Sequence, residues 1–310
     1  MRVLLVGNGQ HSNRRIIPSL IKINKVQEID VVYNKVNHNK FNNELIRYLK
    51  SSEALGNNFY DLIIYATPPK VHLDNLKKYF EFSEHHLIEK PISSDIQTIF
   101  SKDFEKKYSS KYIFESLMYF HHPLVDIVKN ILLNNDCKTI KASFKVPHGD
   151  KNHYRYKKSH GGGSILDQGI YPISLLSYLL KDLKVKEHEY KVDKSLNIDM
   201  SGFISFENKN FKSITAEWAL GEEYSNVLEI ETLKEKYLFP FIFSKNERTL
   251  YEYEVISKNH KKKISVGIHD QFKNMYEDIL NKQYLKFKYS DYKELKKRYE
   301  IINNLISSNK

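Results

Sequence analysis

The chain has 310 residues, of which 41% are hydrophobic and 28% are charged, a balance typical of globular proteins. This length is enough for two domains. No apolar run approaches the length needed to span a bilayer, and the N-terminus enters a strand pattern without the shape of a signal peptide. Cys137 is the only cysteine, which excludes an intrachain disulfide. We expect a cytoplasmic protein with no membrane partner.

The net charge of +11 is compatible with three kinds of partner: nucleic acid, a membrane surface or a phosphorylated small molecule. The lysines are spread along the chain. The one dense run, Lys258 to Lys263, is expected to be a solvated turn between strands. We therefore expect no nucleic-acid partner, and a small molecule that carries a diphosphate suits the charge.

A strand, a glycine turn and a helix open the chain. Arg2 to Val6 form a short apolar run, and a helical pattern covers Arg14 to Ile23. In this context the first glycine of the turn allows a tight bend, and the second lets the backbone approach a pyrophosphate at the helix N-terminus. A serine stands in place of the third glycine. The candidate cofactor-binding residues of the turn are Gly7, Asn8, Gly9, Gln10, His11 and Ser12.

The end of the second predicted strand indicates which dinucleotide binds. This strand covers Glu28 to Tyr33, and the residue that follows it meets the adenosine ribose. An acidic residue there would repel a 2′-phosphate, but the chain has Asn34 and Lys35. These residues favour NADP(H), with NAD(H) possible. The alternative is that they form an ordinary turn.

Three more apolar strands follow, separated by helical segments: Asp61 to Ala66, His85 to Ile88 and Tyr112 to Glu115. Such alternation predicts a parallel, doubly wound sheet, which binds ligands at the carboxyl ends of its strands. We therefore expect residues 1–120 to form a Rossmann dinucleotide-binding domain.

Lys90 is the strongest single candidate for a catalytic residue in this first domain. It follows a buried strand and precedes a proline that rigidifies the turn. A lysine at the rim of a cofactor crevice can polarise a carbonyl or hydrogen-bond a reacting hydroxyl. The alternative is a surface lysine after a strand.

A second candidate segment begins with three consecutive glycines, Gly161 to Gly163. Glycines allow close backbone approach and positive φ angles. The residues after them have the periodicity of a helix that starts near Gly163. Asp167 and Tyr171 are four residues apart on one side of that helix, so they form a candidate proton-handling pair. The alternative is a purely structural role, in which Asp167 is an acidic residue in the second turn of the helix and Tyr171 packs its ring while its hydroxyl contacts solvent.

The pattern changes after residue 120. Strand-like runs follow one another with few helices between them, which predicts an antiparallel sheet. We expect residues 121–310 to form a second domain of α+β class that ends in two helices, His269 to Asn281 and Asp291 to Ile306. No histidine pair has the His-Glu-x-x-His spacing of a zinc site, so we expect no metal. Cys137 is expected in a polar loop. The predicted strands are 139–146, 198–206, 211–219, 227–231, 237–242 and 249–256.

Five motifs in register resemble the glucose–fructose oxidoreductase and inositol dehydrogenase (Gfo/Idh/MocA) family, over nearly the whole chain. A sixth segment, Met118 to Pro123, resembles the Met-Tyr-Arg-x-His-Pro segment of the branch that contains dihydrodiol and xylose dehydrogenases, with Phe120 in place of Arg. Many family members have His where this chain has Tyr171, although that branch uses Tyr. The five motifs are Gly7-Asn8-Gly9, Ala66-Thr67-Pro68-Pro69 with His72, Glu89-Lys90-Pro91, Gly161-Gly162-Gly163 and Asp167-Gln168-Gly169-Ile170-Tyr171.

The resemblance implies an NAD(P)-dependent oxidoreductase that moves hydride between nicotinamide and a sugar or nucleotide-linked keto-sugar. Lys90, Tyr171 and Asp167 would be catalytic. It also implies a second domain with an open, mostly antiparallel sheet that supports a homodimer or homotetramer. Two alternatives stay open: a non-catalytic cofactor-binding regulator of the same fold, and a dehydrogenase of non-sugar diols. Further candidates are Ala66, Thr67, Pro68, His72, Glu89 and Lys90 for the cofactor, and Lys90, His122, Arg155, Asp167 and Tyr171 for the substrate.

Overall fold

The computed structural model describes residues 1–33, 41–50 and 58–307. They fall into two compact units. Unit 1 contains Met1–Leu117 and Phe272–Tyr292, and unit 2 contains Met118–Gln271 and the chain from Lys293 onward. The sequence predicted one change of domain near residue 120. The return of residues 272–292 to unit 1 was not predicted.

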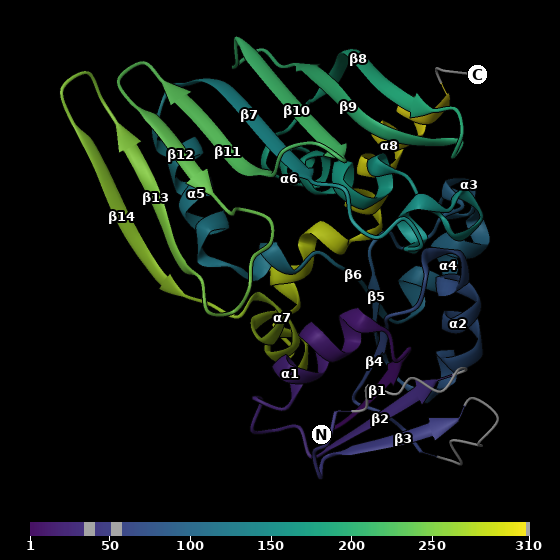
Figure 1. Ribbon diagram of the computed structural model, residues 1–310. Coiled ribbons are helices and arrows are strands. Elements are labelled where there is room, and N and C mark those ends of the chain that lie inside the picture. The colour runs from purple at the N-terminus through teal and green to yellow at the C-terminus, as the bar shows by residue number, and fades with distance from the viewer. Residues whose placement is uncertain (34–40, 51–57, 308–310) are drawn as a thin grey trace. The chain divides into compact units, whose positions relative to one another are not determined.

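Unit 1 is built on a six-stranded parallel sheet with the order β3-β2-β1-β4-β5-β6 (Figure 1). The predicted doubly wound Rossmann sheet is confirmed, because this is the strand order of a dinucleotide-binding fold. The one strand that the sequence pattern missed is β3, which lies at an edge. The bounds are β1 Arg2–Val6, β2 Glu28–Tyr33, β3 Ile46–Lys50, β4 Leu62–Tyr65, β5 His85–Glu89 and β6 Tyr112–Ser116.

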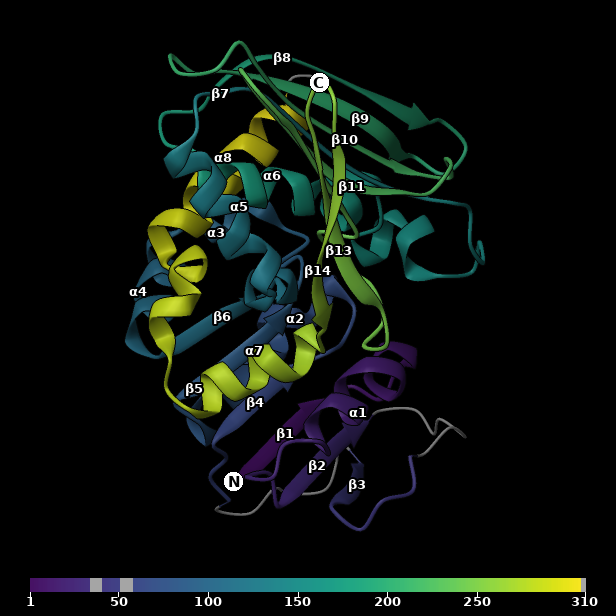
Figure 2. The same cartoon turned by 90° about the vertical axis from the view of Figure 1, so that its left-hand side faces the viewer.

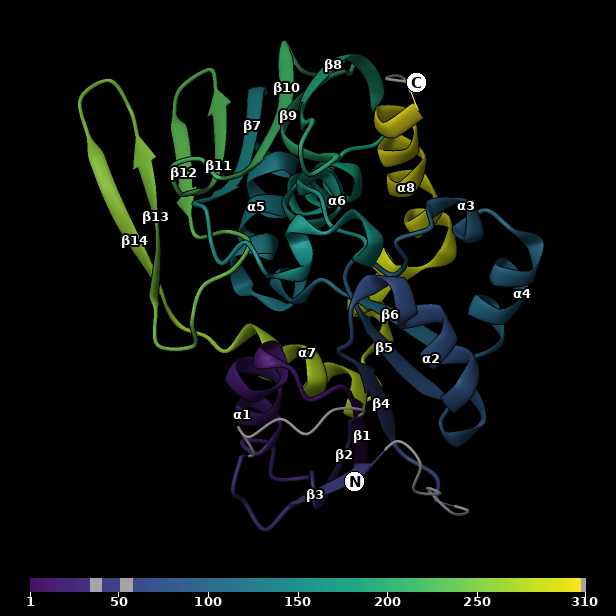
Figure 3. The ribbon, with the colours of Figure 1, turned by 45° about the vertical axis from the view of Figure 1, so that its right-hand side comes forward.

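Helices cover both faces of this sheet. Helices α1 and α7 lie on one face, and α2 and α4 lie on the other (Figures 1 and 3). Short helices that are not α-helical are labelled η. The bounds are η1 Ser12–Ile16, α1 Ile17–Leu20, η2 Pro69–Val71, α2 His72–Tyr79, η3 Phe80–Phe82, α3 Ile96–Ile99, α4 Lys102–Ser110, α7 Gln271–Leu280 and η8 Tyr284–Ser290.

A buried carboxylate holds the edge of the sheet in unit 1. Asp30 on β2 is fully buried and accepts two hydrogen bonds from Arg47 on β3, at 2.8 and 2.7 Å. The hydroxyl of Tyr60 donates to the same carboxylate at 2.6 Å. Burial, followed by the neighbouring Asp30, raises the pKa of Tyr60. These bonds explain how β3 joins the sheet with little apolar surface of its own.

Unit 2 contains an eight-stranded sheet with the order β14-β13-β12-β11-β7-β10-β9-β8. All neighbouring pairs are antiparallel except β7 and β10, so the mostly antiparallel sheet is confirmed. Its two edge strands, β8 and β14, were not predicted. The bounds are β7 Cys137–Val146, β8 Lys184–Asp193, β9 Ile198–Glu207, β10 Ser213–Leu220, β11 Ser225–Thr232, β12 Lys236–Pro240, β13 Leu250–Ile256 and β14 Lys261–Ile268.

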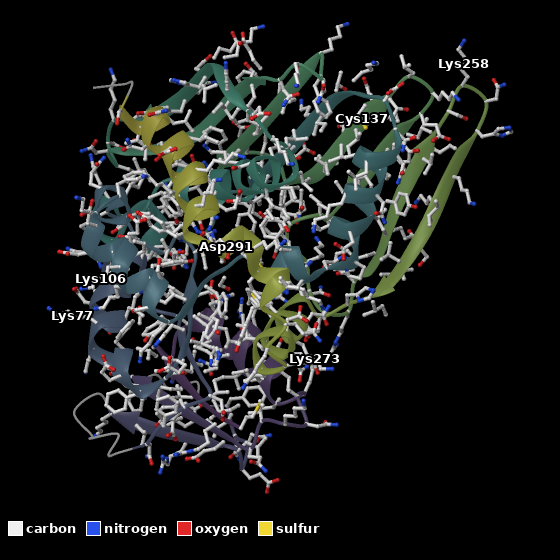
Figure 4. All side chains as sticks on the ribbon, turned by 180° about the vertical axis from the view of Figure 1, so that it is seen from behind. Lys77, Lys106, Cys137, Lys258, Lys273 and Asp291 are labelled. Carbon is white, nitrogen blue, oxygen red and sulfur yellow. The ribbon has the colours of Figure 1, made fainter. Side chains whose placement is uncertain are left out.

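Two sequence expectations in unit 2 were wrong. The lysine run is only partly a turn: Lys258 extends from the turn between β13 and β14 (Figure 4), but Lys261 to Lys263 are the first residues of β14. Lys261 pairs there with Glu254 of β13 at 2.9 Å. Cys137 begins β7 and is buried instead of lying in a polar loop, and its burial raises the pKa of the thiol.

The helices of unit 2 lie on one face of its sheet (Figure 2). Helix α6 has almost all of its side chains buried, which explains why its apolar residues surround it instead of forming a narrow stripe. The bounds are η4 Met118–His121, α5 Pro123–Asn134, η5 Tyr154–Tyr156, η6 Lys158–His160, η7 Ile165–Gly169, α6 Ile170–Leu179 and α8 Tyr292–Ser307.

Candidate active site

The glycine turn after β1 is built for a close backbone approach. Gly7 has a φ of +114°, and a Cβ atom there would lie 2.5 Å from the carbonyl oxygen of Ala66. Only glycine fits this position. The hydroxyl of Ser12 donates to the carbonyl of Gly7 at 2.8 Å, which closes the turn. Ser12 therefore does more than provide the small side chain expected in place of a third glycine.

Unlike Gly7, Gly9 could carry a side chain without a clash inside the fold. A Cβ atom at Gly9 would have no neighbour within 4 Å among the described residues, and Gly9, Gln10 and His11 are all exposed. An absent side chain over open space leaves the backbone accessible to a ligand. The turn therefore fits the pyrophosphate of a dinucleotide, which needs an uncovered backbone at this glycine.

The turn lies where the strand order of the sheet reverses. The amide of Gly7 donates to Val32 on β2, and the amide of Ala66 after β4 donates to Val6 on β1, both at 2.9 Å. A parallel sheet has its ligand crevice at this switch point, outside the carboxyl ends of the strands. Thr67 is half-buried there and Pro68 is exposed. Asn34 and Lys35, which carried the cofactor preference, lie outside the described residues.

His72 connects the loops that follow β4 and β5. Its Nε2 lies 2.7 Å from the carbonyl oxygen of Thr67, and its Nδ1 lies 2.9 Å from that of Pro91. The ring is fully buried, which lowers its pKa. His72 therefore links these two loops to each other.

Glu89 is the last residue of β5, and Lys90 follows it. Burial opposes ionisation of Glu89, but His11 at 3.5 Å, the hydroxyl of Ser116 at 2.9 Å and the charge of Lys90 outweigh it, so the pKa of Glu89 is lowered. The side chain of Glu89 is thus a carboxylate. Lys90 is half-buried and is joined to Pro91 by a cis peptide bond.

Two of the three consecutive glycines, Gly162 and Gly163, approach groups of their own unit closely. Gly163 has a φ of +130°, and a Cβ atom there would lie 2.3 Å from the Oδ1 atom of Asp199. A Cβ atom at Gly162 would lie 2.5 Å from the carbonyl oxygen of Arg155. The sequence predicted a close approach here without naming these partners.

Asp167 and Arg155, two of the predicted substrate-binding residues, form an ion pair. The Nε atom of Arg155 lies 3.0 Å from Oδ2 of Asp167, whose carboxylate is nearly buried. The side-chain amide of Gln168 donates to the same oxygen at 2.6 Å. The sequence analysis named Gln168 only as part of a motif. Its position next to Asp167 was the one feature of the sequence that could have indicated this contact.

The ring of Tyr171 is held by other aromatic rings. Tyr171 is the second residue of α6 and is 6% exposed. Its ring centroid lies 4.8 Å from that of Phe144, 5.7 Å from Tyr119 and 5.9 Å from Phe243. Such packing restricts the ring to one position. Lys90 belongs to unit 1, whereas Tyr171, Asp167 and Arg155 belong to unit 2.

His122, another predicted substrate contact, caps a helix. Its Nδ1 accepts a hydrogen bond from the amide of Leu124 at 3.1 Å, at the start of α5. The ring is 2% exposed and packs on Tyr251 and His269, with centroids 4.0 and 5.0 Å away. Burial, followed by the charge of His269, lowers the pKa of His122 to about 3.

The low pKa of His122 predicts acid sensitivity. A histidine whose folded pKa lies below its unfolded value binds protons more strongly when unfolded, so stability falls as the pH drops below the unfolded value of about 6.5. His122→Asn keeps an acceptor for the helix cap and removes the titration. Between about pH 7 and pH 5 the parent should lose roughly 2 kcal/mol more unfolding free energy than the variant. Urea unfolding at both pH values measures this, and equal losses would contradict the assignment.

In the described part of the chain, no group of three or more His, Cys, Asp or Glu side chains could hold a metal ion. Among the same residues, no helix has the length and apolar character required to cross a membrane.

Comparisons with known proteins give relatives at low identity. No family model matches the chain. It is 23% identical over 221 residues to a dTDP-3,4-didehydro-2,6-dideoxy-alpha-D-glucose 3-reductase from Actinomadura kijaniata, a match that covers 68% of this chain and 65% of the relative. The chain thus spans slightly less than two thirds of that relative's length.

Solved structures share the fold along the whole chain. A 3-ketoreductase from Actinomadura kijaniata, in complex with NADP and TDP-benzene, has a TM-score of 0.86 at 16% identity, with 99% of this chain and 97% of that chain covered. An aldose-aldose oxidoreductase from Caulobacter crescentus, complexed with glycerol, has a TM-score of 0.77 at 12% identity, with 99% and 96% covered. These matches confirm the two-part architecture.

Proposed function

We propose that this chain is an NADP(H)-dependent oxidoreductase of the Gfo/Idh/MocA family that reduces a keto group of a nucleotide-linked sugar. The observation that carries the proposal is the glycine turn at the switch point of the six-stranded sheet, where Gly7 is required by the fold and Gly9 is not. Two relatives support the substrate class, because the proteins from Actinomadura kijaniata and Saccharopolyspora spinosa are reductases of a dTDP-linked keto-sugar. The intact Lys90, Asp167 and Tyr171 favour an enzyme over a cofactor-binding regulator.

The residues of unit 1 would hold the cofactor. The turn from Gly7 to Ser12 would bind the pyrophosphate, and the loop from Ala66 to Pro68 would line the crevice beside it. Bound NADPH supplies the hydride. Lys90, at the carboxyl end of β5, would hydrogen-bond the substrate's carbonyl oxygen and stabilise the negative charge that develops on it. Ionised Glu89 beside it keeps the local charge balanced.

The residues of unit 2 would supply the proton. As the cofactor reduces the carbonyl carbon and the carbon–oxygen π bond breaks, the hydroxyl of Tyr171 would donate its proton to the oxygen, which gives the alcohol. The aromatic packing around Tyr171 would hold this donor in place. Asp167 would orient a sugar hydroxyl and, through their ion pair, Arg155.

Arg155 and the basic charge of the chain suit a diphosphate. The side chain of Arg155 is partly exposed although its Nε faces Asp167, and a guanidinium group can bind phosphate oxygens through its other nitrogens. The nucleotide part of the substrate would provide most of the binding energy. We include in the proposal a cytoplasmic location, supported by the single cysteine, and a homodimer or homotetramer.

A substrate panel tests the proposed function. NADPH oxidation is followed with nucleotide-linked keto-sugars, with the matching free keto-sugars, and in the oxidative direction with NADP and aromatic diols. We expect turnover with the nucleotide-linked compounds only. Turnover of the diols alone would favour a dehydrogenase of non-sugar diols. Cofactor binding without any turnover would favour the non-catalytic regulator.

The cofactor preference is a separate prediction. Lys35 comes two residues after the second strand in the sequence and would supply a cation to a 2′-phosphate, so NADPH should bind more tightly than NADH. Because one hydrogen bond to a charged group contributes about 1.5–3 kcal/mol, Lys35→Ala should weaken NADPH binding about ten- to hundred-fold and leave NADH binding unchanged. Fluorescence titration measures both, with Lys22→Ala, an exposed lysine after α1, as the control. Tighter NADH binding by the parent would refute the preference.

A further inference from the structure

We propose that Asp199 is a positioning residue that fixes the segment carrying Asp167 and Tyr171. The inference rests on the proposed function, because it concerns the geometry of the same site. Asp199 lies near the start of β9, and nothing in the sequence motifs points to it. It acts through backbone and hydroxyl contacts and has no direct role in the chemistry.

Asp199 binds the start of this segment through one oxygen. Its Oδ2 accepts a hydrogen bond from the hydroxyl of Ser164 at 2.6 Å and one from the amide of Ile165 at 2.5 Å. Its other oxygen lies too close to the position that a Cβ atom of Gly163 would take, so the chain can enter the helix here only through a glycine. The carboxylate of Asp199, which lies on a strand distant in sequence, thus accepts a hydrogen bond from a free amide at the helix N-terminus, as an N-cap side chain does.

Near its other end, at Gly169, the segment of residues 164–171 packs against β10. A Cβ atom at Gly169 would lie 3.0 Å from the indole of Trp218, which is fully buried on β10. Strands β9 and β10 are paired directly, with Gly202 opposite Trp218. Between these two contacts the chain forms the π-helix η7, a wide turn that is frequent at functional sites. Asp199 and Trp218 therefore set where η7 begins and where α6, with Tyr171, continues.

Burial and hydrogen bonding act in opposite directions on the ionisation of Asp199. Burial raises the pKa of Asp199 and outweighs the hydrogen bonds that it accepts. For an acid whose folded pKa lies above its unfolded value, the ionised form is disfavoured in the folded state, so stability falls as the pH rises through that pKa. The hydrogen bonds to Ser164 and Ile165 fix the start of the helix.

Two variants of Asp199 separate positioning from folding. Asp199→Ala removes the acceptor, whereas Asp199→Asn keeps a carbonyl oxygen that can accept both bonds. Because misplacing a catalytic group by about 1 Å costs on the order of a hundred-fold, Asp199→Ala should lower kcat by about ten- to a hundred-fold with little change in KM for NADPH. It should also displace the limb of the pH–rate profile that reports Tyr171. Asp199→Asn should restore most of both. Asp193→Ala is the matched control, because Asp193 caps the turn at Ser195 in the same way.

Hydrogen exchange gives a readout that needs no substrate. Amides of residues 164–171 should exchange at least about ten-fold faster in Asp199→Ala than in the parent, and unchanged in Asp193→Ala. If Asp199→Ala does not fold, Ser164→Ala, which removes one of the two bonds, should show a smaller effect in the same direction. Faster exchange in Asp199→Ala, together with a parent that has no reductase activity, would leave the positioning role standing and refute the proposed function. Unchanged exchange and an unchanged pH profile in Asp199→Ala would overturn the inference.

Discussion

Lys90→Ala should lower kcat by about a hundred- to ten-thousand-fold and leave NADPH binding nearly unchanged. The rate falls because the variant lacks the group that would stabilise the developing charge on the substrate oxygen, and groups of this kind contribute rate factors of that size. Cofactor binding stays because the pyrophosphate would rest on the turn after β1, whereas Lys90 follows β5. Single-turnover kinetics and fluorescence titration measure the two effects separately.

Two further variants give this prediction its controls. Lys77→Ala removes an exposed lysine from the outer side of α2 (Figure 4) and should leave kcat unchanged. Lys90→Arg keeps the charge but changes the geometry of its donors, so it should retain only part of the activity. A Lys90→Ala enzyme with near-parental kcat would remove Lys90 from the mechanism.

Tyr171→Phe should keep the fold and lose most of the activity. Phenylalanine preserves the ring packing against Phe144, Tyr119 and Phe243, so unfolding free energy should change by only about 1 kcal/mol. The variant lacks the proton donor, so we expect a loss of kcat/KM of about a hundred-fold or more. Tyr171→His restores a proton carrier and should keep more activity than Tyr171→Phe.

The measurement is kcat/KM against pH for the parent and both variants. Tyr178→Phe is the control, because Tyr178 lies on the same helix and has no proposed part in the chemistry. If the Phe variant matches the parent at every pH, Tyr171 only packs, and the proton comes from Lys90 or water.

The sequence predicted the interior strands of both sheets well and missed the edges. Apolar runs such as Leu62–Tyr65 are buried on both faces, so composition alone reveals them. The three missed strands, β3, β8 and β14, are all at sheet edges, where half-exposed polar residues give no apolar run. Likewise, no local pattern shows that a helix such as α7 returns to a domain that the chain left earlier.

The site shows the same division between local and distant information. The glycine turn, Lys90 and the Asp167–Tyr171 spacing are local patterns, and they could be recognised before the structure was known. The Arg155–Asp167 ion pair and the contacts of Asp199 join residues far apart in sequence, so only the fold reveals them. The helix cap formed by His122 is likewise not visible in its motif, because sequence spacing does not show that its ring accepts a hydrogen bond from the amide of Leu124.

Transfer of deuterium from the cofactor tests the central claim most directly. The chain is incubated with NADPH that carries deuterium at both positions of nicotinamide C4 and with nucleotide-linked keto-sugars, and the product is analysed by mass spectrometry. We expect one deuterium on the reduced sugar carbon with the parent and almost none with Lys90→Ala over the same time. NADPH that binds tightly while no deuterium reaches any nucleotide-linked sugar would contradict the proposal.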